Sequence, residues 1–303
     1  MKKRLPTRII TCAAQVIYLQ SPEGEIMKHI VKFSGGKDST AMLLMMLERG
    51  LPVDEIIFCD TGLEYPEVYE HIQAVEKFTG RQITVLHPPH TFEYFLADIV
   101  KTKGEHAGEH GYGWTRRKDQ RWCTGQLKEK VAARYLKNAG EYTLYIGIAA
   151  DEPSRHYRET AKNIRHLLFE WGITEKMALE YCQSKGFDFG GLYKKFNRLG
   201  CWCCPFQTKK VLRILRRDYP ALWQEMQRLD SKAPNTFKIG RSIAQYERCF
   251  ALEDKQIKLF GNYLAHKASL CDLNIDEVKQ QYIKYAVQKR KKSDMKKLQG
   301  GLF

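Results

Sequence analysis

One stretch near the amino terminus constrains the fold more than any other, because it joins a strand pattern to a helix pattern through two glycines. Residues 28–33 form a short apolar-rich run that stops at Gly35 and Gly36. Residues 39–50 follow, with apolar side chains at helical spacing and Gly50 as a stop signal. This order predicts a strand, a glycine turn and a helix.

The same alternation of strands and helices continues through the first half of the chain. Three more strands are predicted over residues 54–59, 82–87 and 142–150. A helix is predicted over residues 66–79, between the first two of them. Strands that alternate with helices imply a mostly parallel sheet covered on both faces, so we expect a Rossmann-like α/β fold. Ligands of such sheets bind beyond the carboxyl ends of the strands, where Ser34, Asp60 and Asp151 fall.

After residue 160 the strand signal fades and helical patterns take over. Helices are predicted at 174–186, at 209–230 as a pair that meets near Tyr219 and Pro220, and at 244–289. We therefore divide the chain into an amino-terminal extension, a nucleotide-binding domain with a cysteine motif, and a helical basic carboxyl-terminal region. Their bounds are 1–26, 27–235 and 236–303.

Net charge and cysteine content limit the classes of protein to which this chain can belong. A formal net charge of +15 attracts polyanions such as nucleic acid, nucleotides or an acidic protein partner, unless it serves solubility alone. The chain has no run of 18 apolar residues, and polar residues interrupt the signal-peptide-like start, so we expect a cytoplasmic protein without a membrane span. Nine cysteines, three of them within residues 201–204, favour metal or redox chemistry over a disulfide framework.

The glycine turn carries the chemistry of an anion-binding loop. Two glycines allow close backbone approach, so that successive N–H groups point at one anion beside the positive end of a helix. Hydroxyls add donors, the lysine can pair with a phosphate, and the aspartate can hold Mg²⁺ or orient the loop. The spacing differs from that of a Walker A loop. The loop residues are Ser34, Gly35, Gly36, Lys37, Asp38 and Ser39.

Several motifs together resemble one protein family. FSGGKDS resembles the PP-loop of the adenine nucleotide alpha-hydrolase superfamily, and CDTGLEYPEVYEHI (59–72) resembles the second-strand motif of its PAPS-reductase branch. RWCTGQLK (121–128) and GCWCCPF (200–206) resemble cysteine motifs of uncharacterised members of that branch and of its DNA-phosphorothioation sulfurtransferases. The resemblance spans about residues 28–230.

This resemblance implies an adenine nucleotide that lies across the strand ends. The loop would hold phosphate or pyrophosphate, and Asp60, Thr61 and Gly62 would flank it. N-type members cleave ATP between the α- and β-phosphates and form an adenylylated intermediate, whereas the reductases bind adenylyl sulfate or PAPS and use no ATP. On this basis we assign catalytic roles to Lys37, Asp38 and Asp60.

Four cysteines are candidate metal ligands, because closely spaced thiolates hold Zn²⁺ or iron–sulfur clusters. Cys201 and Cys204 form the natural chelating pair, and Cys203 and Cys123 can complete four ligands. The resemblance favours a [4Fe–4S] cluster. The sequence departs from the reductases, which have tandem cysteines in the first motif, so the role of Cys203 stays open. Buried apolar cysteines and a redox-active disulfide are the alternatives.

Two basic segments are candidate binding sites for a substrate anion. Residues 101–122 are rich in Gly, His and basic residues without periodicity, which predicts a loop over the site or a surface insertion. There the aromatic rings of Trp114 and Trp122 could stack on a base. Lys128, just beyond, is typical of an ordinary helix surface, although the family motif that RWCTGQLK resembles keeps a lysine at this position. The anion-binding candidates are Arg116, Arg117 and Arg121 in this segment, and Arg155 and Arg158 after the fourth strand; a solvated helix face is the alternative for the second group.

The motifs favour an ATP-dependent sulfurtransferase with an iron–sulfur cluster, acting on nucleic acid or another large substrate. A reductase of adenylyl sulfate or PAPS is the second candidate. Those reductases carry a Glu-Cys-Gly motif near the carboxyl terminus, and this sequence has none. The third candidate is a nucleotide-binding accessory subunit without turnover.

Overall fold

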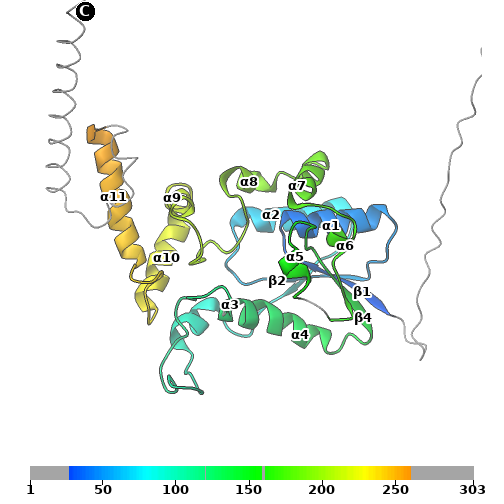
Figure 1. Ribbon diagram of the computed structural model, residues 1–303, viewed down its shortest axis with the longest axis horizontal. Coiled ribbons are helices and arrows are strands. Elements are labelled where there is room, and N and C mark those ends of the chain that lie inside the picture. The colour runs from blue at the N-terminus through cyan, green and yellow to red at the C-terminus, as the bar shows by residue number, and fades with distance from the viewer. Residues whose placement is uncertain (1–26, 120, 159–160, 261–303) are drawn as a thin grey trace, which may run out of the picture. The chain divides into compact units, whose positions relative to one another are not determined.

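The computed structural model describes residues 27–119, 121–158 and 161–260. Within them, five strands form one sheet in the order β3-β2-β1-β4-β5, and every neighbouring pair is parallel (Figure 1). The expected Rossmann-like α/β fold is confirmed. The strands are β1 (Lys28–Phe33), β2 (Glu55–Cys59), β3 (Thr84–Leu86), β4 (Tyr142–Ile146) and β5 (Ile164–Arg165).

Helices cover both faces of this sheet, which explains why the strands are apolar on both sides. Figure 1 shows α1 (Lys37–Glu48), α2 (Pro66–Thr79) and α7 (Glu175–Ser184) on one face and α4 (Lys130–Leu136) on the other. Neighbouring residues of β1, Ile30 and Val31, are both 0% exposed although they point to opposite faces. Ile30 and Val131 of α4 belong to the same buried hydrophobic cluster.

The strand order reverses at β1, and this point determines where a ligand can bind. The chain builds β2 and β3 on one side of β1 and then returns to add β4 and β5 on the other side. In parallel sheets, a crevice opens beyond the carboxyl ends of the two strands at such a reversal. The loop after β1 and the loop after β4 therefore meet at the ligand-binding edge.

The described chain divides into two compact units, each of which is considered by itself. Unit 1 holds residues 27–92 and 121–202 with the whole sheet, and unit 2 holds residues 93–120 and 203–260. The helices after residue 203 group with the segment 93–119 in unit 2, and the division expected at residue 235 stays a prediction. The shorter elements of unit 1 are α3 (Trp122–Thr124), η2 (Gly125–Glu129), α5 (Pro153–His156), α6 (Leu167–Glu170), η3 (Phe189–Gly191) and α8 (Leu192–Lys195).

Unit 2 is helical, and α10 is its central element. It comprises η1 (Tyr94–Asp98), α9 (Lys209–Asp218), α10 (Pro220–Lys232) and α11 (Ile243–Phe260), and α10 packs against the other three. The predicted junction near Tyr219 and Pro220 is confirmed, because Pro220 is the first residue of α10. Proline suits this position since the first helical N–H has no partner within the helix.

The segment at 101–122 is more ordered than its composition predicts. Val100 and His110 form an antiparallel bridge. Trp114 is 1% exposed and donates its indole N–H to Asp230 at 2.9 Å, while its backbone N–H donates to Asn235 at 2.6 Å. The expected stacking of Trp114 on a base is therefore wrong, because unit 2 uses this ring as part of its core.

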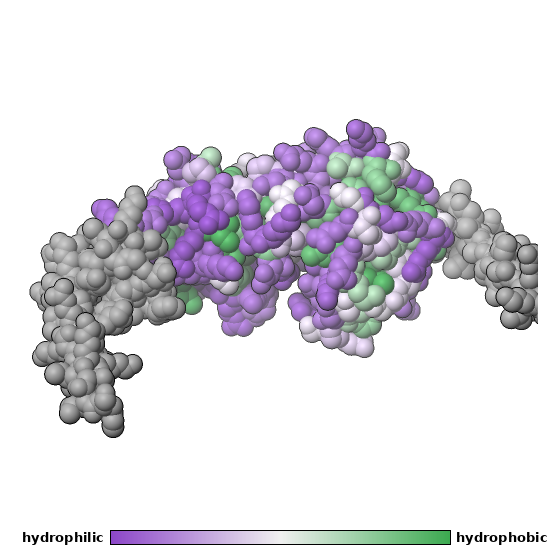
Figure 2. Space-filling view, turned by 90° about the horizontal axis from the view of Figure 1, so that it is seen from above, coloured by the Kyte–Doolittle hydropathy of each residue, from purple (hydrophilic) through white to green (hydrophobic). Residues whose placement is uncertain are grey.

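Other differences from the predicted elements are small. The fourth strand ends at Ile146 rather than at residue 150, and the two-residue β5 was not predicted. The predicted helix 244–289 matches α11 up to Phe260, and its remainder lies outside the described residues, as do the extension 1–26 and the basic tail. No helix in the described ranges has the length and apolar character needed to cross a membrane. Figure 2 shows mostly hydrophilic residues on the visible face, with apolar residues in smaller patches.

Candidate functional site

The loop between β1 and α1 depends on one glycine more than on the other. Gly35 has φ = 71°, and a Cβ there would lie 2.7 Å from Cγ1 of Val68. Gly36 has φ = −95° and is the N-cap of α1. Of the two glycines, only Gly35 therefore needs the left-handed conformation.

The two serines of the loop are hydrogen-bonded to each other. The Ser34 and Ser39 hydroxyls lie 2.9 Å apart, the Ser34 N–H donates to Ser39 Oγ at 3.1 Å, and Ser39 Oγ donates to the Gly36 carbonyl at 3.0 Å. Ser39 is 2% exposed, whereas Ser34 is exposed. Ser39 thus fixes the shape of the loop, and Ser34 is the hydroxyl that an incoming anion can reach.

The loop lysine is held by carboxylates. Lys37 Nζ lies 2.8 Å from Asp38 Oδ2 and 3.1 Å from Glu175 Oε2, and Lys37 as a whole is 7% exposed. Burial raises the pKa of Asp38, and the nearby Lys37 ammonium partly offsets this rise. Glu175 begins α7, and its backbone N–H donates to Asp151 after β4 at 2.9 Å. The sequence did not indicate Glu175, because its contact with the loop spans more than a hundred residues.

The Asp-Thr-Gly motif lies directly after β2, and its polar groups turn the chain. Asp60 Oδ1 accepts hydrogen bonds from the Gly62 N–H and the Tyr69 hydroxyl, both at 2.8 Å. Asp60 Oδ2 lies 3.7 Å from His87 Nδ1. Thr61 is 6% exposed and donates to Glu64 at 3.2 Å. Asp60 therefore has one oxygen committed to the turn and the other at the ligand-binding edge.

A glycine that sequence reasoning missed controls how closely β4 approaches the loop. A Cβ at Gly147 would lie 2.7 Å from the backbone nitrogen of Ser39 and 2.8 Å from the carbonyl carbon of Asp38. Backbone atoms at that distance cannot move aside as a side chain does. Gly147 lies inside the predicted strand 142–150 and directly follows the observed β4, and no sequence pattern distinguished it.

Lys128 is a second missed residue, and the interpretation as ordinary helix surface is wrong. Its ammonium donates to Glu64 at 3.1 Å, and Glu64 is 8% exposed. Burial alone would lower the pKa of Lys128, but the charges of Glu64 and of the Cys201 thiol outweigh burial and raise it. Lys128 therefore connects the β2 loop with the segment that carries Cys201.

The four predicted metal ligands fall in both units. Cys123 and Cys201 are partly exposed in unit 1, while Cys203, which is 2% exposed, and Cys204 belong to unit 2. Cys123 is the second residue of α3, whose N-cap is Arg121. Across the described ranges, no three His, Cys, Asp or Glu side chains come together closely enough to hold a metal ion. Four thiols are suitable donors for a cluster, and the ligand set stays a prediction.

The predicted anion-binding arginines are also distributed. Arg121, Arg155 and Arg158 belong to unit 1, where Arg155 lies 3.3 Å from Glu152 and the other two are exposed. Arg116 and Arg117 are exposed in unit 2, and Arg117 pairs with Asp119 at 2.7 Å. In unit 1, Trp122 stacks on Phe92 with ring centroids 5.2 Å apart. Their binding to a substrate stays a prediction.

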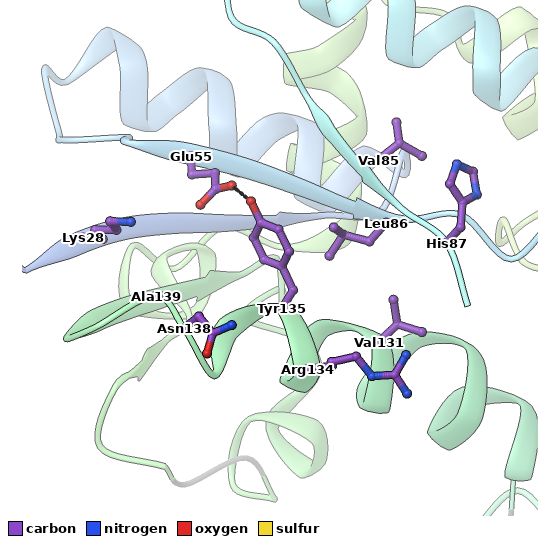
Figure 3. Close-up of a pocket in the computed structure, with 10 residues that line it drawn as sticks. All are labelled: Lys28, Glu55, Val85, Leu86, His87, Val131, Arg134, Tyr135, Asn138 and Ala139. Atoms are coloured by element: carbon purple, nitrogen blue, oxygen red, sulfur yellow. Dashed lines mark hydrogen bonds between the residues drawn. The ribbon is translucent and has the colours of Figure 1, made fainter. Parts of the chain in front are cut away.

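A pocket of about 540 Å³ lies elsewhere in unit 1, between the β2–β3 edge of the sheet and α4 (Figure 3). Tyr135 of α4 donates a hydrogen bond to Glu55 across it, and Lys28 and Arg134 contribute positive charge. None of the loop residues lines this pocket. Leu86 and His87, which line it, are also neighbours of Asp60.

Comparisons with known proteins give the family. A model of the phosphoadenosine phosphosulfate reductase domain matches residues 28–207. An uncharacterized protein of Methanocaldococcus jannaschii is 28% identical over 211 residues, which are 65% of this chain and 40% of that protein. The chain thus spans less than half the length of this relative.

Two solved structures are similar at lower identity. Phosphoadenylyl-sulfate reductase from Candida auris, in a phosphate complex, is 17% identical with a TM-score of 0.39, covering 57% of this chain and 81% of its own. The U34-tRNA thiolase NcsA from Methanococcus maripaludis, solved with its [4Fe–4S] cluster, is 16% identical with a TM-score of 0.36, covering 84% of both chains. Because the domain match spans more than half of the sequence, the chain belongs to the phosphoadenosine phosphosulfate reductase domain family, a family of adenine-nucleotide-binding enzymes of sulfur chemistry.

Proposed function

We propose that this protein is an ATP-dependent sulfurtransferase, which activates an acceptor oxygen by adenylylation and then replaces it with sulfur. The observation that carries the proposal is the loop after β1, at the point where the strand order reverses. There the amino-terminal end of α1 and the exposed Ser34 hydroxyl lie at the edge where a nucleotide binds in parallel sheets.

The residues of the site suit the chemistry of ATP cleavage at the α-phosphate. The acceptor oxygen forms a bond to the α-phosphorus, the bond to the bridging oxygen breaks, and pyrophosphate leaves. A sulfur nucleophile then attacks the activated carbon, and AMP leaves. Lys37 would turn from Glu175 to the departing phosphates, which frees the carboxylates of Asp38 and Glu175 to hold Mg²⁺. Bound Mg²⁺ would neutralise the charge that develops on the leaving group.

The four cysteines support the sulfur part of the proposal. Thiolates of Cys123, Cys201, Cys203 and Cys204 would hold a [4Fe–4S] cluster, and Zn²⁺ is the alternative ion. A bound cluster would supply iron sites with affinity for sulfur. The net charge of +15 supports a polyanionic acceptor such as nucleic acid, with Arg116, Arg117, Arg121, Arg155 and Arg158 as its candidate contacts.

The domain match favours a second candidate, a reductase of PAPS or adenylyl sulfate. The two activities use different nucleotides and release different products. With a thiol reductant, a reductase releases sulfite from the sulfonucleotide and leaves ATP intact. A sulfurtransferase forms AMP and pyrophosphate from ATP when acceptor and sulfide are present.

The test uses the full chain, purified without oxygen. ATP, PAPS and adenylyl sulfate affinities are measured by calorimetry, and AMP, pyrophosphate and sulfite are quantified with and without transfer RNA or single-stranded DNA. We expect ATP binding and AMP formation that depends on a nucleic acid. Sulfite release would support the reductase, and ATP binding without turnover on any acceptor would support an accessory subunit.

Gly35→Val is the matched loop variant. A side chain at φ = 71° that also meets Val68 at 2.7 Å distorts the loop, so we expect ATP affinity to fall by about 100-fold or more. Gly50→Val, at φ = 63° with open space around it, serves as the control and should bind ATP normally. Unchanged ATP affinity in Gly35→Val would contradict the assignment of the loop.

A further inference from the structure

A tyrosine hydroxyl lies against the first amide of the phosphate loop's helix. The backbone N–H of Lys37 donates to Tyr193 Oη at 2.8 Å, although the two residues are 156 positions apart. Tyr193 belongs to α8, and its ring packs edge-on against Phe189 with centroids 4.9 Å apart. Lys37 Nζ lies 6.0 Å from the centre of the same ring. Two groups of the loop lysine therefore face Tyr193.

The phenol still has a hydrogen to donate. Its oxygen accepts from the Lys37 amide, and among the described residues no acceptor takes its own proton. Burial raises the pKa of Tyr193, so the phenol remains protonated at neutral pH. A half-buried O–H beside an anion-binding loop is thus a donor that a bound oxyanion can use.

The glycine at position 36 leaves the space such an oxyanion would take. A Cβ there would lie 3.4 Å from Tyr193 Oη and 3.6 Å from Ser34 Oγ, with no backbone atom of another segment within 4 Å. Two hydroxyls thus flank the place where Gly36 has no side chain, next to the positive end of α1. Both hydroxyls and the helix end suit a tetrahedral oxyanion.

We propose that Tyr193 is a phosphate-binding residue of this site, which donates its phenolic hydrogen to a nucleotide phosphate oxygen above Gly36 while it holds the Lys37 amide. The ligand class rests on the proposed nucleotide-binding function. Tyr193 also makes α8 part of the nucleotide site, and the chain continues from α8 to Cys201.

Tyr193→Phe tests the proposal, because it removes the hydroxyl and keeps the ring that packs on Phe189. Calorimetry on the full chain measures the Kd of inorganic pyrophosphate, ATP and adenosine. A hydrogen bond to a charged group corresponds to roughly 10- to 100-fold in affinity, so we expect that loss for pyrophosphate and ATP. Adenosine, which has no phosphate, should bind as it does to the wild type.

Two further variants serve as a control for Tyr193→Phe and as a test of where the phosphate binds. Tyr181→Phe removes a phenol beside Glu48, at the opposite end of α1, and should leave pyrophosphate binding unchanged. Gly36→Ala should fold with the wild-type melting temperature, because φ = −95° suits alanine and its nearest neighbours are at ordinary contact distance. Its methyl group fills the space between the hydroxyls, so pyrophosphate should bind at least tenfold more weakly.

The outcomes separate this proposal from the function on which it rests. Failure of the wild type to bind either pyrophosphate or ATP would overturn the proposed function. Normal wild-type binding with a Tyr193→Phe affinity within twofold would overturn only the role of Tyr193. Tight pyrophosphate binding by folded Gly36→Ala would place the phosphate elsewhere on the loop and likewise overturn it.

Discussion

The phosphate loop and the cysteine motif are both short, chemically distinctive segments, but they build their sites in different ways. The loop takes its shape from neighbours in sequence: Ser34, Gly36 and Ser39 bond to one another. The four candidate cysteine ligands instead lie far apart in sequence, since Cys123 precedes Cys201 by 78 residues, and they belong to both units. The backbone of the loop is therefore largely set by its own strand and helix, whereas ligands that lie far apart in sequence need a metal or further packing to bring them together.

The largest expected effect tests the distributed site. Anaerobic wild-type protein should be brown and contain iron and sulfide, and Cys201→Ser or Cys204→Ser should lose the colour and the iron, because each removes a thiolate ligand. Visible absorption and metal analysis provide the measurement. Cys182→Ala is the control, since this thiol is buried in α7 against the Lys37 carbonyl. ATP affinity should stay within about threefold in the Cys204 variant if the two sites form independently.

Two results would correct this prediction in different ways. Colourless protein with one zinc per chain would exclude the iron–sulfur cluster and keep the metal site. Protein with neither metal after anaerobic reconstitution would exclude both and leave the cysteines as thiols of another role.

The same contrast explains what could be predicted from the sequence. The strand, the glycines and the helix at 28–50 follow from periodicity and turn chemistry, which act over a few residues. Glu175 and Tyr193 reach the loop through tertiary contacts alone, and no local pattern distinguishes them from ordinary helix residues. For Lys128 the family motif was the only sign, and its contact with Glu64 comes from tertiary packing. Trp114 shows the reverse error, because its basic surroundings predict a binding surface, yet Asp230 and Asn235 hold it in a core.

The second prediction concerns Gly147, where the backbone after β4 lies against the backbone of the loop. Gly147→Val puts a side chain against the Ser39 and Asp38 backbone, which forces β4 and α1 apart. We expect the free energy of unfolding to fall by about 3 kcal/mol or more, together with weaker ATP binding. Chemical denaturation measures the first effect and calorimetry the second.

Gly200→Ala is the matched control, because a Cβ at Gly200 meets no atom within 4 Å. It should unfold within about 0.5 kcal/mol of the wild type, as surface substitutions usually do. If Gly147→Val were equally harmless, the close approach of β4 to the loop would not contribute to stability. The shape of the loop would then depend on its own strand and helix alone.

The smallest expected effect is a pH dependence that arises behind the loop. His71 is 5% exposed, its Nε2 lies 2.9 Å from Thr40 Oγ1, and burial lowers its pKa to about 4 from 6.5, although the charge of Asp188 partly opposes this. Between these two values the unfolded chain binds a proton that the folded protein does not. The contribution of neutral His71 is therefore present above pH 6.5 and is lost as the pH falls toward 4. From pH 7 to pH 5 the loss is about 2 kcal/mol.

His71→Phe should remove this part of the acid sensitivity, because phenylalanine keeps the aromatic packing on Phe189, whose ring centroid lies 4.2 Å away, but cannot titrate. The variant loses the Thr40 contact at every pH, so its free energy of unfolding at pH 7 should be lower than that of the wild type. The difference between the two free energies should shrink by about 2 kcal/mol at pH 5, because only the wild type is destabilised by acid. Urea unfolding at both pH values gives the four free energies needed. A difference that stays constant or grows toward pH 5 would mean that His71 is charged in the folded protein. Thr40, one residue after the loop, would then lie beside an imidazolium. This cation would add to the positive charge that the helix amides and Lys37 already supply at the amino-terminal end of α1.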